Sequence, residues 1–390
     1  MKWKFYSLAF VAGMSILTAC SSDDNNDNDG NGGNGNGNEI ENGTILKGTI
    51  TSDVTLAAGN TYKLSGEYIV EEGATLHIEE GVKIIAVYDD IADYILVKQG
   101  GKINAVGTSD KPIVMTSEKE EPGAWGGIHI CGRAHTNAEG GKGSSEIGGA
   151  VYGGNDDADN SGTLQYIRLE YTGFAFDEEH EANGISFYSV GNGTIVDHCQ
   201  AYKGSDDGFE FFGGSVNVSN LVAVSCSDDS FDWTEGWNGK GTNLVAYQEA
   251  ESTLGYDCDC LMECDNNGSN NAATPVAHPV LKNLILVGNG GSKQGIRLRA
   301  GTEVEIDNAK VCGKGQPLTV ETALTENALK NGTSKLTNIT LTSELSSKEG
   351  IYTHADFIAV TSNKVDANLS YSSFEDIKKE CSWMNGSWVK

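Results

Sequence analysis

The chain has 390 residues, with 50 Gly and only 5 Pro, and its 55 acidic and 27 basic side chains give a formal net charge of −28. This charge argues against nucleic acid and anionic lipid headgroups as partners, because too few basic side chains are present to neutralise phosphates. The glycine excess lacks the three-residue period of collagen, so we expect a folded chain with many turns.

The N-terminus has the pattern of a lipoprotein signal. Residues 1–4 contain two lysines, residues 5–17 form a short apolar run, and Leu17-Thr18-Ala19-Cys20 follows. The run is too short to span a bilayer, so residues 1–19 are predicted to be a signal peptide, with Cys20 acylated after cleavage. A buried helix with a chance cysteine is the alternative. Residues 20–40 are rich in Asn, Asp and Gly and are expected to be a flexible tether. We therefore expect a protein anchored in the outer membrane through lipid on Cys20 and exposed at the cell surface.

From about residue 41 onward, short β-rich runs alternate with Gly, Asp or Asn, which is the pattern of strands separated by turns. A unit of about 22 to 25 residues is one coil of a right-handed parallel β-helix, and we predict this all-β fold for residues 41–390. Asparagine tolerates a left-handed backbone at a bend, and its amide can bond to the equivalent residue of the next coil, about 4.8 Å away. A sandwich of irregular strands is the alternative. The repeat consists of an asparagine just before a strand, at spacings of 23, 40, 25 and 30 residues: Asn220, Asn243, Asn283, Asn308 and Asn338.

The spacing of 40 residues predicts a coil with an inserted loop near 249–274. Helical periodicity is weak everywhere and is confined to residues 321–329 and 373–380. The fold class therefore rests on the strand repeat.

Several motifs occur in combination along the chain: Trp125-Gly-Gly-Ile-His-Ile-Cys-Gly-Arg-Ala134, Tyr152-Gly-Gly-Asn-Asp-Asp157, Tyr166-Ile-Arg-Leu-Glu-Tyr171, Gly191-Asn-Gly-Thr194 and the run from Ser205 to Gly214. Together they resemble the motifs of a family of surface lipoproteins in the Bacteroidota, which is expected to adopt the pectate-lyase-like β-helix fold. The acidic Ser21-Ser22-Asp23-Asp24 after Cys20 also resembles the export tag of such lipoproteins. The resemblance covers roughly residues 41–340 and implies the fold and the location, but it brings no established activity.

An acidic motif occurs twice, 22 residues apart. Ser205-Asp-Asp-Gly-Phe-Glu-Phe211 is followed by Ser227-Asp-Asp-Ser-Phe-Asp-Trp233. If the two copies lie in adjacent coils, paired carboxylates about 5 Å apart repel each other by roughly 1 kcal/mol in water and about 3 kcal/mol at an effective dielectric of 20. The aspartates either cap bends through hydrogen bonds to the backbone, bind Ca²⁺ through oxygen ligands, or act as catalytic carboxylates. The candidate metal ligands are Asp206, Asp207, Asp228 and Asp229.

A second candidate calcium turn contains Asp157 and Asp159. The spacing Asp157-x-Asp159-x-Ser161-Gly162 matches the opening of an EF-hand loop, but Arg168 stands where the twelfth-position Glu is required. The segment is therefore not an EF-hand, and a simpler Ca²⁺-binding turn remains as the hypothesis.

Aromatic and basic side chains near the acidic motif are candidate ligand-binding residues. Phe211, Trp233 and Trp237 either stack in the core or form an exposed column that stacks on sugar rings. Arg297 and Arg299 point the same way on one strand and could hold a uronate carboxylate, or they form a salt-bridged surface.

Three cysteines lie close together in the expected inserted loop. Cys258, Cys260 and Cys264 do not have a standard zinc spacing. A disulfide, free thiols and a soft-metal site are the three interpretations of this cluster.

The function most consistent with these features is a non-catalytic binding or adhesion module for a polysaccharide or a host or matrix protein, which Ca²⁺ could stabilise. The first alternative is a polysaccharide lyase or glycoside hydrolase acting on an acidic polysaccharide, with Asp206, Asp207, Asp228, Asp229 and Arg297 as the catalytic candidates. The second alternative is a structural envelope protein without a small ligand.

Overall fold

The computed structural model describes residues 38–89, 91–176 and 180–390. Cys20, the expected signal peptide and most of the expected tether lie outside these residues. The paired structure begins at Asn38, three residues earlier than expected, because β1 (Asn38–Glu39) is hydrogen-bonded to β3 (Val54–Leu56). No helix in the described segments of the chain has the length and apolar character needed to cross a membrane.

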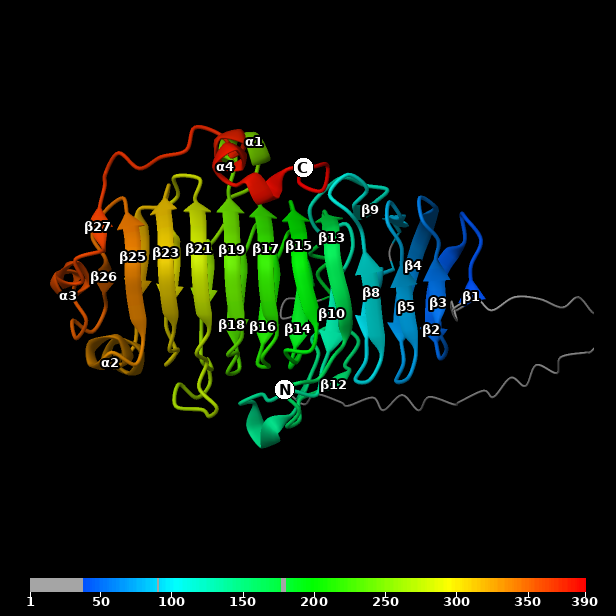
Figure 1. Cartoon of the computed structure of the whole chain (residues 1–390), viewed down its shortest axis with the longest axis horizontal. Coiled ribbons are helices and arrows are strands. Elements are labelled where there is room, and N and C mark those ends of the chain that lie inside the picture. The colour runs from blue at the N-terminus through cyan, green and yellow to red at the C-terminus, as the bar shows by residue number, and fades with distance from the viewer. Residues whose placement is uncertain (1–37, 90, 177–179) are drawn as a thin grey trace, which may run out of the picture. The chain divides into compact units, whose positions relative to one another are not determined.

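The strands form one continuous sheet of 25 strands that winds into a right-handed parallel β-helix, as predicted (Figure 1). In the first coils, three stacks run along the axis, and β4 (Thr61–Val70) belongs to two of them, because its first half pairs with β6 (Lys83–Ala86) and its second half with β7 (Tyr94–Val97). From β13 onward, two of them merge into one stack of long bent strands, because β13 pairs with both β8 and β9. The strands of the first coils are β1, β2 (Ile45–Ile50), β3, β4 (Thr61–Val70), β5 (Thr75–Ile78), β6 (Lys83–Ala86), β8 (Lys102–Val106) and β9 (Ile113–Ser117).

We call the merged stack the long stack and the third stack the short stack. The long stack consists of β13 (Gly162–Glu170), β15 (Ile195–Tyr202), β17 (Asn217–Val224), β19 (Lys240–Tyr247), β21 (Val280–Val287), β23 (Glu305–Cys312), β25 (Lys335–Leu341) and β27 (Lys364–Val365). The short stack consists of β7 (Tyr94–Val97), β10 (Ile128–Cys131), β14 (Ile185–Tyr188), β16 (Phe209–Phe212), β18 (Phe231–Thr234), β20 (Met262–Cys264), β22 (Gln294–Leu298), β24 (Gln316–Val320) and β26 (Ser346–Ser347).

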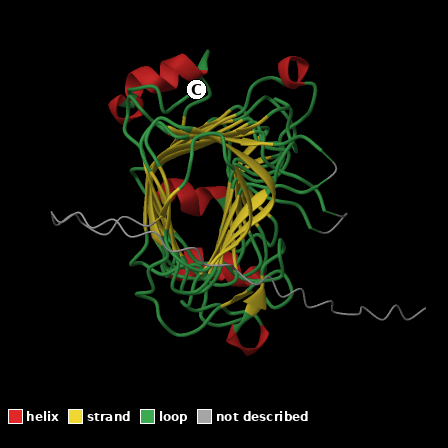
Figure 2. Cartoon of the chain, turned by 90° about the vertical axis from the view of Figure 1, so that its right-hand side faces the viewer, coloured by secondary structure: helices red, strands yellow, loops and turns green. Residues whose placement is uncertain are grey.

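The core fills the space enclosed by the stacks, which Figure 2 shows from one end. Side chains alternate between the two faces of a strand, so in β16 Phe209 and Phe211 point into the core while Glu210 lies on the outer face. Equivalent positions stack from coil to coil, and the rings of Phe209 and Phe231 lie parallel with centroids 5.6 Å apart. The inner face of the short stack is therefore apolar, whereas its outer face carries both polar side chains such as Glu210 and a second apolar cluster that includes Leu96, Tyr188 and Phe212.

The asparagine ladder predicted from the repeat is present at the bends of β17, β19, β21 and β23, whereas Tyr166 and His198 occupy the equivalent left-handed positions in β13 and β15. Asn220, Asn243 and Asn283 have φ values of 55°, 60° and 60°, in the left-handed region that asparagine tolerates. The Asn243 side-chain amide donates to Oδ1 of Asn220 over 2.8 Å, and the Asn283 amide donates to Oδ1 of Asn243 over 3.0 Å. Asn308 continues the ladder to Asn283 at 2.9 Å. The predicted left-handed backbone is confirmed at all five asparagines, but the predicted bonding ends at Asn308, because the Asn338 amide donates to Oδ1 of Asp307 over 2.6 Å.

Two segments project from the coils. The first insertion, residues 132–161, follows β10 and contains the 3₁₀ turn η1 (Glu139–Gly141) and a small antiparallel hairpin of β11 (Gly143–Ser144) and β12 (Val151–Tyr152). The coil with the 40-residue spacing does not carry a single loop over 249–274, because β20 lies inside that range. Its extra length is divided between a segment with the short helix α1 (Glu251–Leu254) before β20 and the second insertion, residues 265–279, after it.

Three longer helices lie outside the coils. α2 (Ala323–Asn331) and α3 (His354–Ala359) lie near the final strands, and α4 (Phe374–Glu380) is followed by the turn η2 (Ser382–Met384) (Figure 1). The expected helices at 321–329 and 373–380 are thus confirmed within two residues. Residues 366–390, which we call the strap, pack Met384 and Trp388 against the outer face of the long stack.

Candidate functional site

The two copies of the acidic motif occupy equivalent places in adjacent coils of the short stack. Asp206 and Asp207 directly precede β16, and Asp228 and Asp229 directly precede β18. β16 pairs in parallel register with β18, Glu210 opposite Asp232. Since all six carboxyl groups lie at the start or on the outer face of neighbouring strands, the repeat gathers them in one region.

One carboxylate of each pair supports the backbone of the next coil. Asp207 Oδ1 accepts the backbone N–H of Asp229 over 2.8 Å, and Asp229 Oδ1 accepts that of Cys260 over 2.6 Å. Asn183 has the equivalent role in the preceding coil, since its Oδ1 accepts the N–H of Asp207 over 3.2 Å. The interpretation that the aspartates cap bends is therefore confirmed for one oxygen of Asp207 and one of Asp229.

Of the six carboxyl groups, all except that of Asp229 line a cavity of about 250 Å³, which we call the acidic pocket. Glu146 reaches it from the first insertion, and the Tyr188 hydroxyl donates to Glu146 Oε2 over 3.3 Å. No lysine, arginine or histidine belongs to the described set of lining residues, although the charges of three basic side chains outside the lining act on its carboxyl groups: His180 on Glu146, Lys293 on Asp228 and Arg299 on Asp232. The lining residues are Glu146, Glu181, Asn183, Asp206, Asp207, Glu210, Asp228 and Asp232.

The pocket strongly disfavours the ionised form of its carboxyl groups. Burial, followed by the charge of Asp228, raises the pKa of Asp206 to about 7. Burial, followed by the charge of Asp259, raises the pKa of Asp228 to about 6. Burial also raises the pKa of Glu146 to about 7, and the pKa values of Asp207 and Glu210 lie well above their ordinary range for the same cause. At neutral pH, these groups must share protons or surround a cation.

The donor atoms fit a hard divalent cation such as Ca²⁺. Side-chain oxygens of Asp206, Asp207 and Asp228 all lie within 4.8 Å of one another, and a second such group consists of Asp207, Glu210 and Asp232. Oxygen-only donor sets favour Ca²⁺ over Zn²⁺. Asp232 Oδ1 is buried and has no hydrogen-bond partner within the described structure, which is costly for a carboxylate unless a ligand satisfies it. The donor atoms of the acidic pocket therefore fit a calcium ion.

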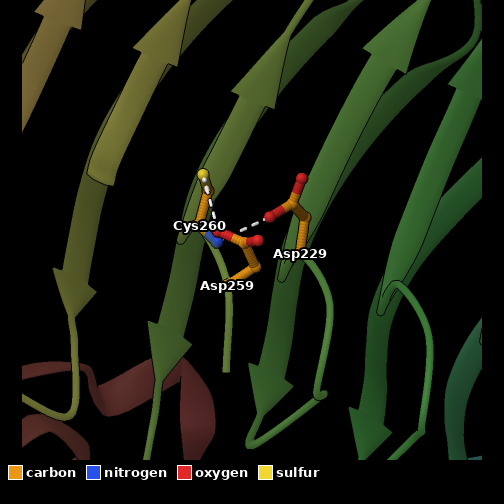
Figure 3. Close-up of side chains that lie close together, drawn as sticks. All are labelled: Asp229, Asp259 and Cys260. Atoms are coloured by element: carbon orange, nitrogen blue, oxygen red, sulfur yellow. Dashed lines mark hydrogen bonds between the residues drawn. The ribbon is translucent and has the colours of Figure 1, made fainter. Parts of the chain in front are cut away.

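A third group, Asp229, Asp259 and Cys260, fits a metal less well (Figure 3). Asp259 Oδ2 already pairs with the Lys293 ammonium at 2.5 Å, and Asp229 Oδ1 is occupied by the Cys260 N–H. Burial raises the pKa of the Cys260 thiol far above its ordinary value, which opposes the thiolate form that binds metals. The main role of this group is therefore to hold adjacent coils together through hydrogen bonds.

Arg297 and Arg299 lie on the same outer face but form salt bridges. Arg297 Nη1 lies 2.8 Å from Glu263 Oε1, and Arg299 contacts both Glu263 and Asp265 at 2.7 Å. The alternative of a salt-bridged surface is confirmed, and the prediction that the two arginines are available to hold a uronate or to assist catalysis is wrong in this structure. Their positive charge is already matched by neighbouring carboxylates.

Phe211, Trp233 and Trp237 are core residues. They are 2%, 1% and 1% exposed, and the rings of Phe211 and Trp237 stack with centroids 4.2 Å apart. The prediction that they bind sugar rings is therefore wrong. An alternating strand pattern places residues i and i+2 on one face but does not say which face is buried.

Asp157 and Asp159 hold the first insertion. Asp157 Oδ1 lies 2.6 Å from His135 Nδ1, and Asp159 Oδ2 accepts the backbone N–H of Arg133 over 2.9 Å. Neither belongs to a group of three or more potential ligands among the described residues. One oxygen of each carboxylate thus has a partner within the chain, which gives both residues a structural role, and the calcium turn stays a prediction.

Cys258, Cys260 and Cys264 are buried free thiols, as are the other cysteines of the described chain. Cys264 lies in β20, inside the β-helix and not in a protruding loop. The interpretation as free thiols is therefore confirmed over a disulfide.

Comparison with known proteins identifies the family. The family model described as a pectate-lyase like beta helix domain matches residues 48–390. The chain belongs to this family. No curated protein matches the chain. Among solved structures, this β-helix domain is similar to the Dettilon tailspike protein, with 8% sequence identity and a TM-score of 0.28. The match covers 76% of this chain and 55% of the tailspike chain, so the β-helix domain spans about half the length of that protein.

Sequence reasoning missed three members of the acidic pocket. Asn183-Gly184-Ile185 precedes β14 as Asp207-Gly208-Phe209 precedes β16, so an Asn/Asp-Gly-apolar repeat could have revealed Asn183. Glu146 and Glu181 lie outside the coil repeat, and no local signal in the sequence distinguishes them from other surface glutamates.

Proposed function

We propose that this β-helix domain is a non-catalytic, Ca²⁺-dependent binding module for an acidic polysaccharide, displayed on the outer membrane by lipid on Cys20. The observation that supports the proposal is the acidic pocket, where oxygens of Asp206, Asp207 and Asp228 lie within 4.8 Å of one another and no basic side chain lines the cavity. A Ca²⁺ ion held there would supply the positive charge that a uronate carboxylate requires.

The chain's own residues contribute rigid positions for the cation ligands. Asp207 is 6% exposed and fixed by its bond to the next coil, so its orientation needs little ordering when a ligand binds. Asp228 lies on the exposed rim, where it can meet both the ion and a polymer in solvent. The pocket thus has a rigid ligand in Asp207 and a solvent-exposed ligand in Asp228, an arrangement that suits an extended polysaccharide chain.

Calorimetric titration of the protein with Ca²⁺, followed by a glycan array in Ca²⁺ or EDTA, tests the proposal. We expect Ca²⁺ binding to weaken at least tenfold in Asp206→Asn and in Asp228→Asn, and uronate-containing glycans to be retained only with Ca²⁺. Glu344→Gln, an exposed change outside the pocket, is the matched control and should bind as the wild type does. Absence of Ca²⁺ binding, or Ca²⁺-independent retention of the glycans, would contradict the proposal. Retention of host or matrix proteins alone would redirect it to that class of ligand.

Glycoside hydrolysis is the second candidate function, and one observation favours it. The pKa values of about 7 for Asp206 and about 6 for Asp228 suit a general acid working near neutral pH. A reducing-end assay on the glycans retained by the array separates the two candidates. Product formation that is lost in Asp206→Asn supports hydrolysis, whereas retention without product supports the binding module.

The proposed lipid anchor is tested separately. Cells that express the wild type or Cys20→Ala are labelled with an alkyne fatty acid and treated with protease. We expect labelling and surface cleavage of the wild type and no labelling of the variant. Equal labelling of both proteins would exclude Cys20 as the acylated residue.

A further inference from the structure

A larger groove lies between the two insertions, apart from the acidic pocket. Its volume is about 590 Å³, and its floor is Thr234 and Glu235 at the end of β18. One wall comes from the first insertion around Asn137, and the other comes from the second insertion, residues 267–270. Both insertions project on the same side of the short stack (Figure 1). The volume falls within the range of about 300 to 1,000 Å³ that is typical of small-ligand sites.

Buried amides join the two walls and fix the shape of the groove. Asn137 Nδ2 donates to Asn266 Oδ1 over 2.8 Å, and Asn267 Nδ2 donates to Asn137 Oδ1 over 3.0 Å. Asn137 is 8% exposed and Asn266 is fully buried. Because these bonds connect segments about 130 positions apart in the chain, the groove exists before any ligand arrives.

The groove presents uncharged hydrogen-bonding groups to its interior. The side-chain Oδ1 of Asn270 accepts the backbone N–H of Ala272 over 3.2 Å, which leaves the two N–H groups of the side-chain amide for a ligand. Within the described structure, the hydroxyls of Ser269 and Thr234 form no hydrogen bond to another protein group. The Asn270 amide and these two hydroxyls are therefore available to form hydrogen bonds with a ligand in the groove.

The acidic residues of the groove do not make it a cation site. Glu235 is engaged by the chain itself, because its carboxylate accepts the Tyr152 hydroxyl over 3.0 Å and the Thr136 hydroxyl over 2.7 Å. Glu139 lies exposed at the rim, where it repels anionic ligands. No large apolar side chain appears in the described lining, so an apolar ligand would gain little from entering.

From these observations we propose that the groove between the insertions binds a neutral saccharide. Such a ligand matches amide and hydroxyl groups with many hydroxyls, carries no charge for Glu139 to repel, and needs no metal ion. The site goes beyond the proposed calcium-dependent function, since the lining residues of the groove and of the acidic pocket do not overlap.

The test uses the full chain in EDTA, so that any calcium-dependent binding is switched off. Cellohexaose, laminarihexaose, mannohexaose and xylohexaose are screened by saturation-transfer NMR, and the affinity for any binder is measured by calorimetry. Asn270→Asp keeps the oxygen that accepts the Ala272 N–H and removes the amide donors. Asn42→Asp is the matched control, because Asn42 is exposed, its Oδ1 also accepts a backbone N–H, from Thr61 over 2.9 Å, and it does not line the groove.

We expect at least one neutral hexasaccharide to bind, with affinity reduced about fivefold or more in Asn270→Asp, the factor that corresponds to about 1 kcal/mol for one lost hydrogen bond. Asn42→Asp and Asp206→Asn should bind as the wild type does. Lack of binding to all four saccharides overturns the proposal, and so does equal binding by wild type and Asn270→Asp. Loss of binding in Asp206→Asn would place the saccharide in the acidic pocket and also overturn it.

Discussion

Replacing Asp206 with asparagine should change stability in opposite directions with and without Ca²⁺. Asparagine has nearly the same shape as aspartate and removes one charge from the group formed with Asp207 and Asp228. Two unit charges 4.8 Å apart repel each other by about 3 kcal/mol at an effective dielectric of 20. Since the pocket is open to solvent and protons relieve some of this energy, we expect Asp206→Asn to raise the free energy of unfolding in EDTA by about 1 to 3 kcal/mol.

With Ca²⁺ the order of stability should reverse. An ion at 1,000 times its dissociation constant stabilises the folded wild type by about 4.1 kcal/mol, which exceeds the gain expected for Asp206→Asn in EDTA, and a variant that has lost a ligand does not receive this stabilisation. Thermal melts and denaturant midpoints of wild type, Asp206→Asn and the control Glu344→Gln, in EDTA and in excess Ca²⁺, measure both effects. If Asp206→Asn is less stable than wild type in EDTA as well, the carboxylates do not repel each other in the folded state and the reasoning fails. An identical melting temperature of the wild type in both buffers would remove the calcium site.

Three further predictions concern the framework around the site. Asn243→Ala should lower the free energy of unfolding in denaturant by about 2 to 3 kcal/mol, because two half-exposed ladder bonds are lost and alanine must adopt φ near 60°. Asn243→Gly should cost less, and equal costs of the two variants would show that the backbone conformation carries no penalty. Burial raises the pKa of Asp93 to about 6 from an ordinary 3.8, so the folded state retains a proton there and the free energy of unfolding should fall by about 3 kcal/mol as pH rises from 4 to 7. Asp93→Asn should flatten this slope in denaturation experiments across that pH range, and an unchanged slope would show that Asp93 is not its source. Trp388→Ala should cost about 3 to 5 kcal/mol in denaturant unfolding because the ring is fully buried between the strap and the long stack, whereas a loss below 1 kcal/mol would mean that the strap is loosely held.

The repeat made much of the fold predictable, because each coil reproduces the surroundings of the one before it. Asn243 meets the same bend and the same neighbour as Asn220, so a pattern visible in the sequence becomes a ladder in space. The same logic placed Asp207 beside Asp229. Positions set by the coil period could be assigned without any knowledge of distant contacts.

Residues outside that period could not be assigned in this way. Glu146 reaches the acidic pocket through the first insertion, whose path depends on contacts such as those between Asn137 and the second insertion. The aromatic residues failed for another reason. The alternation that sets Phe211 opposite to Glu210 is equally consistent with either residue facing solvent, and only closure of the coil around the core decides between them.

The strap also changes how the solenoid can come apart. In a stack whose coils touch only their neighbours, one end can unravel while the other remains folded. Here Glu380 in the strap pairs with Lys310 on β23, while the Ser387 carbonyl accepts from Arg168 on β13 over 2.7 Å. Coils far apart along the axis are thereby linked through one segment, and opening any coil between them must also disturb it. Ser387 also donates to the Ser109 and Asp110 carbonyls between β8 and β9. The central coils, which carry the acidic pocket, should therefore unfold as one cooperative block, and stepwise fraying should be confined to the coils that precede β8 or follow β23.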